Sequence, residues 1–448
     1  MGALAQALRA REGGGSGGGG RGGAAPLRLR RVGAGEISPT EFACSCLAPN
    51  DAVVVVEGAV REPEVPGRER GAGGGVTEWA AAGLWRDPAS GGVDIEALAR
   101  AFGDSSVCAT ECPAPGEPEP EHGRCSRTLP FSEYAQYWRR LAEARRSGAC
   151  VAEPLLYVQN WHLPSELPPR EGAPFYAVPE LFRRSGDWLN AFLDAERRRE
   201  LGRGEDGGGA GASDYRFVYL GPAGTSTPLH VDVLHSYSWS VNVAGRKRWR
   251  LVPPEWTECL LGPGGELAPS LDPALPGFPR VREALAHVVE VVQETGEALF
   301  VPSGWHHTVE NLEDTLSINH NWINAYNCGR SWGVLRADFR EACRQIEDCR
   351  SLCPPGEFLA LALRNLRLNS GLQLPMFGRM LAQAAAAAQD TEPGDEYGRA
   401  QAALDLRVSR GLLREVLVEL TAGSPEGARE SPEVRDLEAR LRELEARP

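Results

Sequence analysis

Residues 237–252 read YSWSVNVAGRKRWRLV, two short strand-like runs joined by a tight turn at Ala244-Gly245. In residues 237–243 apolar and polar side chains alternate with a period of two, which is the pattern of a β-strand. Glycine supplies the backbone freedom that a tight turn needs. The stretch therefore predicts a hairpin that places Lys247 opposite the first strand.

Short runs of the same kind flank this stretch. Further strands are expected at 155–161, 216–220, 298–301, 308–311 and 315–320. Many short strands at regular spacing favour a sandwich or jelly roll over a parallel βαβ sheet. The predicted fold class is mainly β with flanking helices: a jelly-roll barrel of the double-stranded β-helix type, with helical segments before and after it.

The sequence predicts four regions along the chain: a disordered Gly/Arg-rich tail (1–36), a mixed helical and strand region packing on the barrel (37–174), a β-rich domain (175–342) and a helical C-terminal region (343–448). Helices are expected at 94–102, at 132–141 with Ser132 as N-cap, and at 185–197. The glycine-rich stretch 204–211 reads as a mobile loop.

Composition narrows the classes of function. The formal net charge of −13 disfavours direct binding to nucleic acid and would steer a basic protein segment toward the surface. No apolar run approaches the roughly 20 residues that cross a bilayer. The eleven cysteines lack zinc-knuckle spacing, and no secretory signal precedes them. These features predict a cytoplasmic protein, with the nucleus as the alternative.

Six of the eight histidines lie between His230 and His320. His230 and Asp232 are two residues apart, so their side chains share one face at a strand end, and a second strand supplies His307. Two neutral imidazoles and one carboxylate form the facial triad of non-haem iron(II) oxygenases, which leaves positions for a co-substrate and dioxygen. From spacing alone, the adjacent His306 competes with His307 for this role.

Lys247 is the only lysine among the 48 basic residues of the chain. An ammonium and a guanidinium are not interchangeable at a tight site, so the lysine suggests a specific need for a compact cation. A buried unpaired lysine is costly, and this one would either bind an anion or extend to solvent. The alternative is an arginine bias in composition that one lysine escaped by chance.

The strings around these residues resemble the JmjC family of protein hydroxylases and demethylases over about residues 176–324. The matching segments are TPLHVD (227–232), Trp239, GRKRW (245–249) and FVPSGWHH (300–307). The resemblance implies that Fe(II) is held by His230, Asp232 and His307, because the GW-x-H register selects His307 over His306.

The same resemblance implies a binding site for 2-oxoglutarate, which is consumed together with O2. It assigns Lys247 to the distal carboxylate of 2-oxoglutarate and adds Thr227 and Asn319 as further contacts. Ser240 departs from the pattern, since some relatives carry asparagine there. Asn242, two residues along the same strand face, is a candidate to compensate.

Two upstream strings, LYVQNWH (156–162) and DWLN (187–190), resemble the small JmjC lysyl hydroxylases of the eukaryotic translation termination factor. The expected function is therefore Fe(II)- and 2-oxoglutarate-dependent lysyl hydroxylation of a protein substrate. The alternatives are a histone N-methyl-lysine demethylase, a non-catalytic JmjC-like binding module and a cupin-type isomerase. The lack of a Cys/His-rich reader module favours the hydroxylase over the demethylase, and the intact triad with Lys247 argues against the other two. The C-terminal helices are expected to cap the barrel or to form a homodimer interface.

Overall fold

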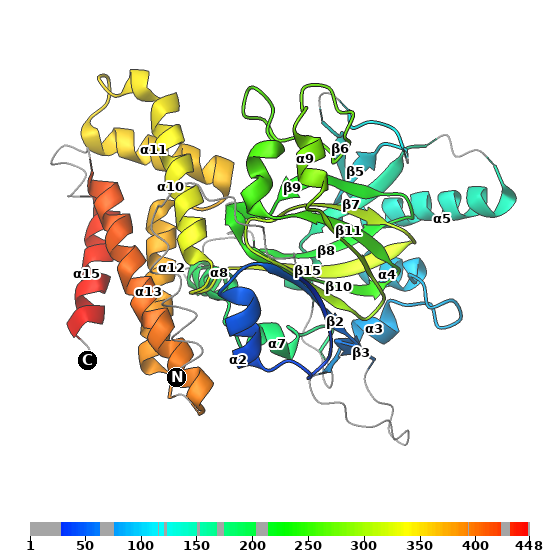
Figure 1. Ribbon diagram of the computed structural model, residues 1–448, viewed down its shortest axis with the longest axis horizontal. Coiled ribbons are helices and arrows are strands. Elements are labelled where there is room, and N and C mark those ends of the chain that lie inside the picture. The colour runs from blue at the N-terminus through cyan, green and yellow to red at the C-terminus, as the bar shows by residue number, and fades with distance from the viewer. Residues whose placement is uncertain are drawn as a thin grey trace.

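The computed structural model describes residues 28–62, 76–114, 116–120, 123–149, 153–167, 174–202, 214–392, 394–422 and 431–446 (Figure 1). Within these residues the strands form a nine-stranded sheet, a four-stranded sheet and the short pair β3 (Val60–Arg61) and β4 (Thr77–Glu78). The C-terminal helices stand to one side of the sheets (Figure 1). The expected loop at 204–211 lies outside the described residues.

The eight consecutive strands β8 to β15 are divided equally between the two large sheets. The nine-stranded sheet holds β8 (Arg216–Gly221), β10 (Tyr237–Ala244), β13 (Ala298–Val301) and β15 (Thr315–Trp322). The four-stranded sheet holds β9 (Ser226–Val231), β11 (Lys247–Val252), β12 (Val289–Gln293) and β14 (His306–Asn311). This arrangement confirms the predicted double-stranded β-helix.

The N-terminal region extends the larger sheet on both edges rather than only packing against the barrel. Its strands are β1 (Arg28–Gly33), β2 (Ala52–Glu57), β5 (Ser106–Cys112), β6 (Ser126–Pro130) and β7 (Leu155–Trp161). The order across the sheet is β1-β2-β13-β10-β15-β8-β7-β5-β6. β2 pairs antiparallel with β13, so the N-terminal region directly supports a barrel strand.

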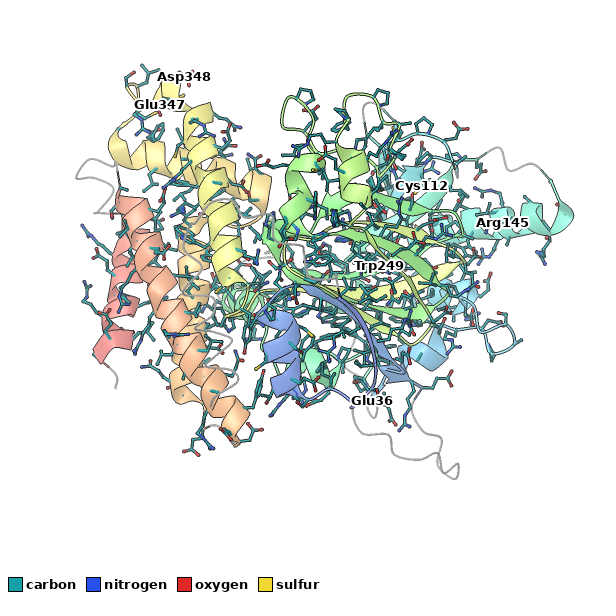
Figure 2. The ribbon with its side chains drawn as sticks, in the orientation of Figure 1. Glu36, Cys112, Arg145, Trp249, Glu347 and Asp348 are labelled. Atoms are coloured by element: carbon teal, nitrogen blue, oxygen red, sulfur yellow. The ribbon has the colours of Figure 1, made fainter. Side chains whose placement is uncertain are left out.

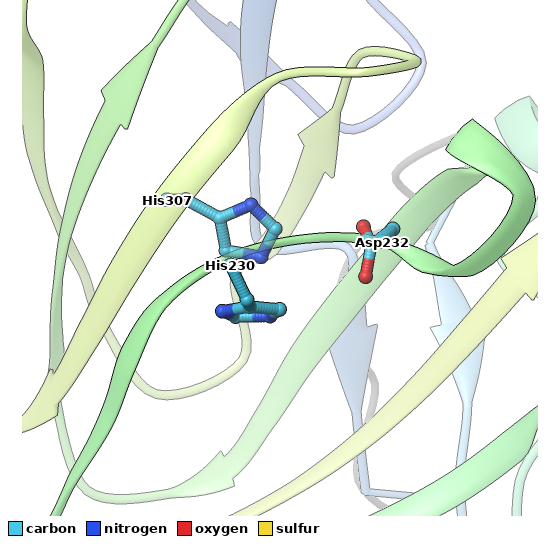
Figure 3. Close-up of side chains that lie close together, drawn as sticks. All are labelled: His230, Asp232 and His307. Atoms are coloured by element: carbon cyan, nitrogen blue, oxygen red, sulfur yellow. The ribbon is translucent and has the colours of Figure 1, made fainter. Parts of the chain in front are cut away.

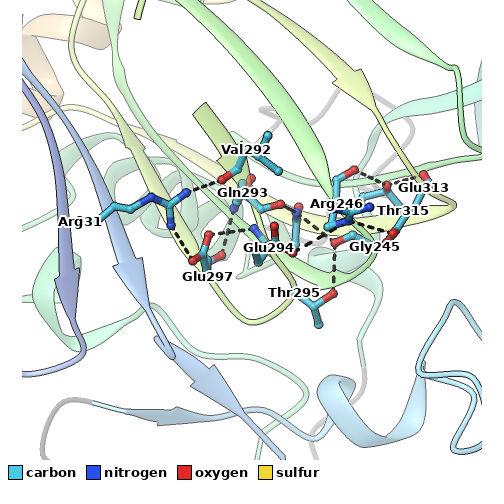
Figure 4. Close-up of polar contacts among 11 residues, drawn as sticks. Arg31, Gly245, Arg246, Val292, Gln293, Glu294, Thr295, Glu297, Glu313 and Thr315 are labelled. Atoms are coloured by element: carbon cyan, nitrogen blue, oxygen red, sulfur yellow. Dashed lines mark hydrogen bonds and ion pairs between the residues drawn. The ribbon is translucent and has the colours of Figure 1, made fainter. Parts of the chain in front are cut away.

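The predicted disordered tail is too long at its C-terminal end. Residues 28–33 form β1, which runs parallel to β2 along six paired positions. Charged side chains that suggested disorder find partners here: Arg31 bonds Glu297 at 2.8 Å and the Val292 carbonyl at 2.5 Å (Figure 4). The remainder of the predicted tail, residues 1–27, lies outside the described residues.

The turn between β10 and β11 crosses from one sheet to the other. β11 pairs with β12 and β14, not with β10, so the predicted hairpin is wrong, although the turn itself is present. Gly245 has φ +78°, and an added Cβ would lie 2.3 Å from the Asp314 carbonyl oxygen, which makes glycine necessary. The Gly245 carbonyl accepts a bond from Thr295 Oγ1 at 3.1 Å (Figure 4).

The central strands β10, β13 and β15 of the larger sheet are buried on both faces. Alternate residues of β10 join the apolar cluster beneath the helices: Tyr237, Trp239, Val241 and Val243. The intervening residues are polar but equally buried: Ser238, Ser240 and Asn242. A second apolar cluster joins residues of β2 and β13 in the larger sheet to residues of β11, β12 and β14 in the smaller one. It includes Trp249, which is labelled in Figure 2. Polar side chains therefore line part of the barrel interior.

The helices before β9 are α2 (Pro39–Phe42), the π-helical η1 (Ala43–Leu47), α3 (Ala81–Leu84), α4 (Ile95–Phe102), α5 (Phe131–Ser147), α6 (Leu163–Glu166), α7 (Glu180–Arg183) and α8 (Trp188–Gly202). Asp94 caps α4 by accepting a hydrogen bond from the backbone N–H of Ala97, so the helix expected at 94–102 begins at Ile95. The N-cap of α5 is Pro130 rather than Ser132, because β6 runs directly into the helix.

Within the barrel segment the short helical turns are η2 (Val233–His235), η3 (Pro254–Cys259) and α9 (Val281–Leu285). The C-terminal part holds α10 (Cys328–Gln345), η4 (Glu347–Cys349), α11 (Pro355–Ser370), α12 (Leu374–Asp390), α13 (Glu396–Thr421) and α15 (Pro432–Ala446). The region boundary expected at 342/343 thus falls inside α10. None of the described helices combines the length and apolar character needed to cross a bilayer.

Candidate metal and co-substrate site

Three side chains from two strands of the smaller sheet meet inside the barrel. His230 lies near the end of β9, Asp232 follows that strand directly, and His307 lies on β14 opposite His230. Their ligand atoms all lie within 4.8 Å of one another (Figure 3). Among the described residues, this is the one such cluster of His, Cys, Asp and Glu side chains.

Backbone carbonyls set the orientation of both imidazoles. His230 Nδ1 lies 2.9 Å from the Pro228 carbonyl oxygen, and His307 Nδ1 lies 3.1 Å from that of Trp305. A carbonyl only accepts, so each Nδ1 carries a proton, and in the neutral ring Nε2 then keeps a free lone pair for a metal. Burial, together with the nearby His230, lowers the pKa of His307 to about 4, which keeps it neutral.

The carboxylate of Asp232 is held from the facing sheet. Ser238 Oγ, on the barrel side of β10, donates to Asp232 Oδ2 at 2.6 Å. Hydrogen bonds of this kind fix the direction in which a ligating carboxylate points. Ser238 is therefore a supporting residue, and a serine on a strand gives no signal of this role in the sequence.

His306 lies outside the cluster. It is paired with Val231 and Val252, and neighbouring residues of a strand point to opposite faces, so it turns away from His307. Its side chain is buried, its Nδ1 has no hydrogen-bond partner among the described residues, and burial lowers its pKa to about 4. The strand register thus separates the two histidines as the GW-x-H resemblance implied.

Lys247 is buried inside the same barrel, with 1% of its surface exposed. Its Nζ donates to Ser317 Oγ at 2.5 Å and lies 5.5 Å from the centre of the Tyr219 ring. No carboxylate of the described residues forms an ion pair with it, and burial lowers its pKa to about 7. A buried ammonium without a counter-charge is a ready partner for an anionic ligand.

Asn319 and Ser240 are connected to Lys247 through the hydroxyl of Ser317. Asn319 Oδ1 accepts from Ser317 Oγ at 3.0 Å and from Ser240 Oγ at 3.1 Å. Asn242 is used elsewhere, since its Nδ2 donates to the Gln293 carbonyl at 3.0 Å. Of the two residues considered at this position, Ser240 is therefore the one connected to the lysine.

One cavity brings these residues together. It is lined by Tyr157, Tyr219, Thr227, His230, Asp232, Ser238, Lys247, Trp249, His307, Val309, Asn319 and Asn321. All six residues predicted for metal or co-substrate therefore face the same space. Gln159 reaches its edge, with Nε2 donating to Thr227 Oγ1 at 3.3 Å.

The residues that the sequence did not single out are mainly Tyr157, Tyr219, Ser238 and Asn321. Their common signal is position: Tyr157, Tyr219 and Ser238 lie on predicted strands at the polar or aromatic alternate places. With both strand faces buried, those places turn into the barrel rather than to solvent.

The donor set fits a metal and a 2-oxo dicarboxylate in one cavity. Two imidazole nitrogens and one carboxylate suit iron(II) and leave further coordination positions open. The ammonium of Lys247 offers the charge that a second carboxylate needs. The cavity therefore offers both a set of metal ligands and a separate cation for a second carboxylate.

Comparisons with known proteins agree with this geometry. A family model described as a cupin-like domain matches residues 73–328. The 2-oxoglutarate and iron-dependent oxygenase JMJD4 of Homo sapiens is 34% identical over 82% of this chain and 83% of its own length. The arginine-specific demethylase JMJ20 of Arabidopsis thaliana is 34% identical over 78% of this chain and 68% of its own. A bifunctional arginine demethylase and lysyl-hydroxylase, psr-1 of Caenorhabditis elegans, is 32% identical over 35% of this chain and 37% of its own.

The family match covers more than half of the chain, and the human relative is aligned along most of both lengths. The cavity holds a triad suited to iron and a cation suited to a dicarboxylate. The chain belongs to the cupin-like JmjC family of 2-oxoglutarate and iron-dependent oxygenases.

Proposed function

We propose that this oxygenase hydroxylates a side chain of a protein substrate, with His230, Asp232 and His307 as its iron ligands. The observation that carries the proposal is the pairing of this triad with Lys247, the single lysine, in one buried cavity. A buried cation at that place needs a counter-charge, which a dicarboxylate bound to the metal would supply through its far carboxylate.

Each residue has a separate task in this proposal. The neutral Nε2 atoms of His230 and His307 and the carboxylate of Asp232 hold iron, which with O2 and 2-oxoglutarate supplies the oxidant for a C–H bond. Lys247 neutralises the distal carboxylate of 2-oxoglutarate and so fixes the direction in which the co-substrate lies. Thr227 and Asn319 offer further hydrogen bonds to it from the cavity wall.

For the substrate we propose a lysine of a translation termination factor. The resemblance of residues 156–162 and 187–190 to the lysyl hydroxylases of that factor supports this choice. So does the name of the relative psr-1, a bifunctional arginine demethylase and lysyl-hydroxylase that matches about a third of the chain. The net charge of −13 also favours a basic partner segment.

Demethylation of N-methylarginine is the second candidate, because the relative JMJ20 is named as an arginine-specific demethylase. The two reactions use the same iron chemistry and differ in the carbon that is hydroxylated. Hydroxylation of an N-methyl group releases that carbon as formaldehyde, whereas a hydroxylated lysine side chain keeps its oxygen.

Mass spectrometry of the substrate separates these outcomes. The protein is incubated with Fe(II), 2-oxoglutarate and either the recombinant termination factor or a methylarginine peptide, with Asp232→Ala as the inactive control. The proposal expects the termination factor to gain one oxygen atom on a lysine, in step with succinate release. Loss of methyl groups with formaldehyde formation, and no oxygen gain, would assign the demethylase activity instead.

A further inference from the structure

Asn50, in the link between η1 and β2, clamps the loop that precedes His307. Its Nδ2 donates to the Ser303 carbonyl at 2.8 Å, and its Oδ1 accepts from the Ser303 backbone N–H at 2.8 Å. The two residues are 253 positions apart in the chain. Asn50 is 5% exposed and has φ +61°, a left-handed conformation that asparagine tolerates better than most residues.

A first route leads from Asn50 to His307. The carbonyl oxygen of Asn50 accepts a bond from Trp305 Nε1 at 3.0 Å. The carbonyl of the same tryptophan accepts the Nδ1–H of His307, at 3.1 Å. Trp305 is therefore held by Asn50 through its ring and orients the histidine through its backbone, so two hydrogen bonds separate Asn50 from a metal ligand.

A second route leads to Asp232. Ser303 Oγ donates to the His235 carbonyl at 2.6 Å, and the His235 N–H donates to the Asp232 carbonyl at 3.0 Å. Leu234 and His235 have φ of +54° and +47°, and such strained residues persist only where their surroundings hold them. The clamped loop thus also holds the turn that carries Asp232.

We propose that Asn50 is a positioning residue for the metal centre, acting through Ser303 and Trp305 on the loops that carry Asp232 and His307. The inference rests on the ligands assigned in the proposed function. In this proposal the link between η1 and β2 helps to position the metal ligands. Loss of a partner bonded directly to a ligand typically weakens metal binding by about 10- to 100-fold. Asn50 acts through one further residue, so we expect an effect toward the lower end of that range.

The test measures Mn(II) binding by the full chain, with Mn(II) as a redox-stable substitute for iron. Asn50→Gly keeps the left-handed backbone accessible but removes both amide bonds, and Asn50→Asp keeps the acceptor alone. We expect the dissociation constant for Mn(II) to rise about tenfold or more in Asn50→Gly and less in Asn50→Asp. The visible spectrum of the Co(II)-loaded protein, which reports ligand geometry, should shift as well.

Asn324→Ala is the matched control. Asn324 is fully buried, its Nδ2 donates to the Ser185 carbonyl at 3.0 Å, and its Oδ1 accepts from the Tyr326 N–H at 3.0 Å. It has the same chemistry as Asn50, but neither partner lies in a loop that carries a ligand. We expect it to lower the thermal midpoint while leaving the affinity for Mn(II) unchanged.

Two results would overturn the role of Asn50: wild-type affinity for Mn(II) in Asn50→Gly, or an equal loss of affinity in Asn324→Ala. His230→Ala separates this failure from a failure of the ligand assignment. If His230→Ala binds Mn(II) normally, the ligands are wrong and the inference falls with them. If it loses Mn(II) while Asn50→Gly keeps it, only the role of Asn50 is rejected.

Discussion

His307 on β14 pairs in register with His230 on β9, and the centres of their imidazole rings lie 4.2 Å apart. The spacing is set by the β-ladder, and each ring is turned by a hydrogen bond to a backbone carbonyl two residues earlier. The protein therefore presents both nitrogen ligands in place, so little ordering entropy remains to oppose metal binding.

The first prediction separates the two adjacent histidines. His307→Ala should abolish measurable Fe(II) or Mn(II) binding, because one of three protein ligands is lost. His306→Ala removes a buried side chain that points away from the cluster, so it should cost about 1–2 kcal/mol of unfolding free energy and leave metal affinity unchanged. Metal titration and urea unfolding of both variants measure the two effects.

A loss of metal in His306→Ala with normal binding in His307→Ala would show that the register of β14 against β9 is one residue out. A one-residue slip moves every side chain of a strand to the opposite face, so it would place His306 instead of His307 in the cluster.

The second prediction concerns Ser238, which bonds Asp232 Oδ2 at 2.6 Å. Ser238→Ala frees the carboxylate to rotate and should weaken metal binding about tenfold. Ser240→Ala is the control on the same face of β10, since Ser240 contacts Asn319 instead. Isothermal titration with Mn(II) should find normal affinity in Ser240→Ala, and equal losses in the two variants would argue against a specific role for Ser238.

The strand β10 shows what the sequence could and could not predict. Its period of two correctly predicted a strand, and the same reading would place Ser238, Ser240 and Asn242 toward solvent in an ordinary two-layer sheet. In the structure helices cover one face and the second sheet covers the other, so the polar face becomes the cavity wall. Alternation fixes which residues share a face but not what that face meets.

The clustering of His230, Asp232 and His307 could be predicted because their residue types and local spacing carry a signal, whereas Asn50 carries none. Its contact with Ser303 depends on β2 joining the sheet beside β13, a pairing between distant parts of the chain. The predicted hairpin at Gly245 failed for a related reason. A turn signal fixes the reversal of the chain, but the partners of β11 were strands far along the sequence.

The third prediction is that replacing Lys247 by an apolar residue stabilises the ligand-free protein but weakens its binding of 2-oxoglutarate. Lys247→Met replaces a buried ammonium by an apolar side chain of similar length, and should raise the unfolding free energy of the ligand-free protein by about 1–3 kcal/mol. It should also weaken 2-oxoglutarate binding by about 30-fold or more, because the charge-assisted contact is lost. Denaturant unfolding and titration of 2-oxoglutarate into Mn(II)-loaded protein test both halves.

Arg248→Met is the control for this variant. Arg248 neighbours Lys247 on β11, but its side chain lies on the outer face, 3.5 Å from Glu310. Its loss should change neither quantity by much, since exposed ion pairs contribute little. If Lys247→Met bound 2-oxoglutarate normally, the lysine would have no part in co-substrate binding.

The last prediction is the pH dependence of 2-oxoglutarate binding. Burial lowers the pKa of Lys247 to about 7 in the ligand-free protein, and a bound carboxylate would raise this pKa again. Binding therefore takes up a proton above pH 7, and affinity should be greatest below that pH and fall above it, by up to about tenfold per pH unit. A guanidinium stays charged throughout, so Lys247→Arg should bind more weakly but without this slope. Calorimetry in buffers of different ionisation enthalpy measures the proton uptake on the Mn(II)-loaded protein. An identical slope in Lys247→Arg would place the titrating group elsewhere in the cavity and remove Lys247 from the explanation.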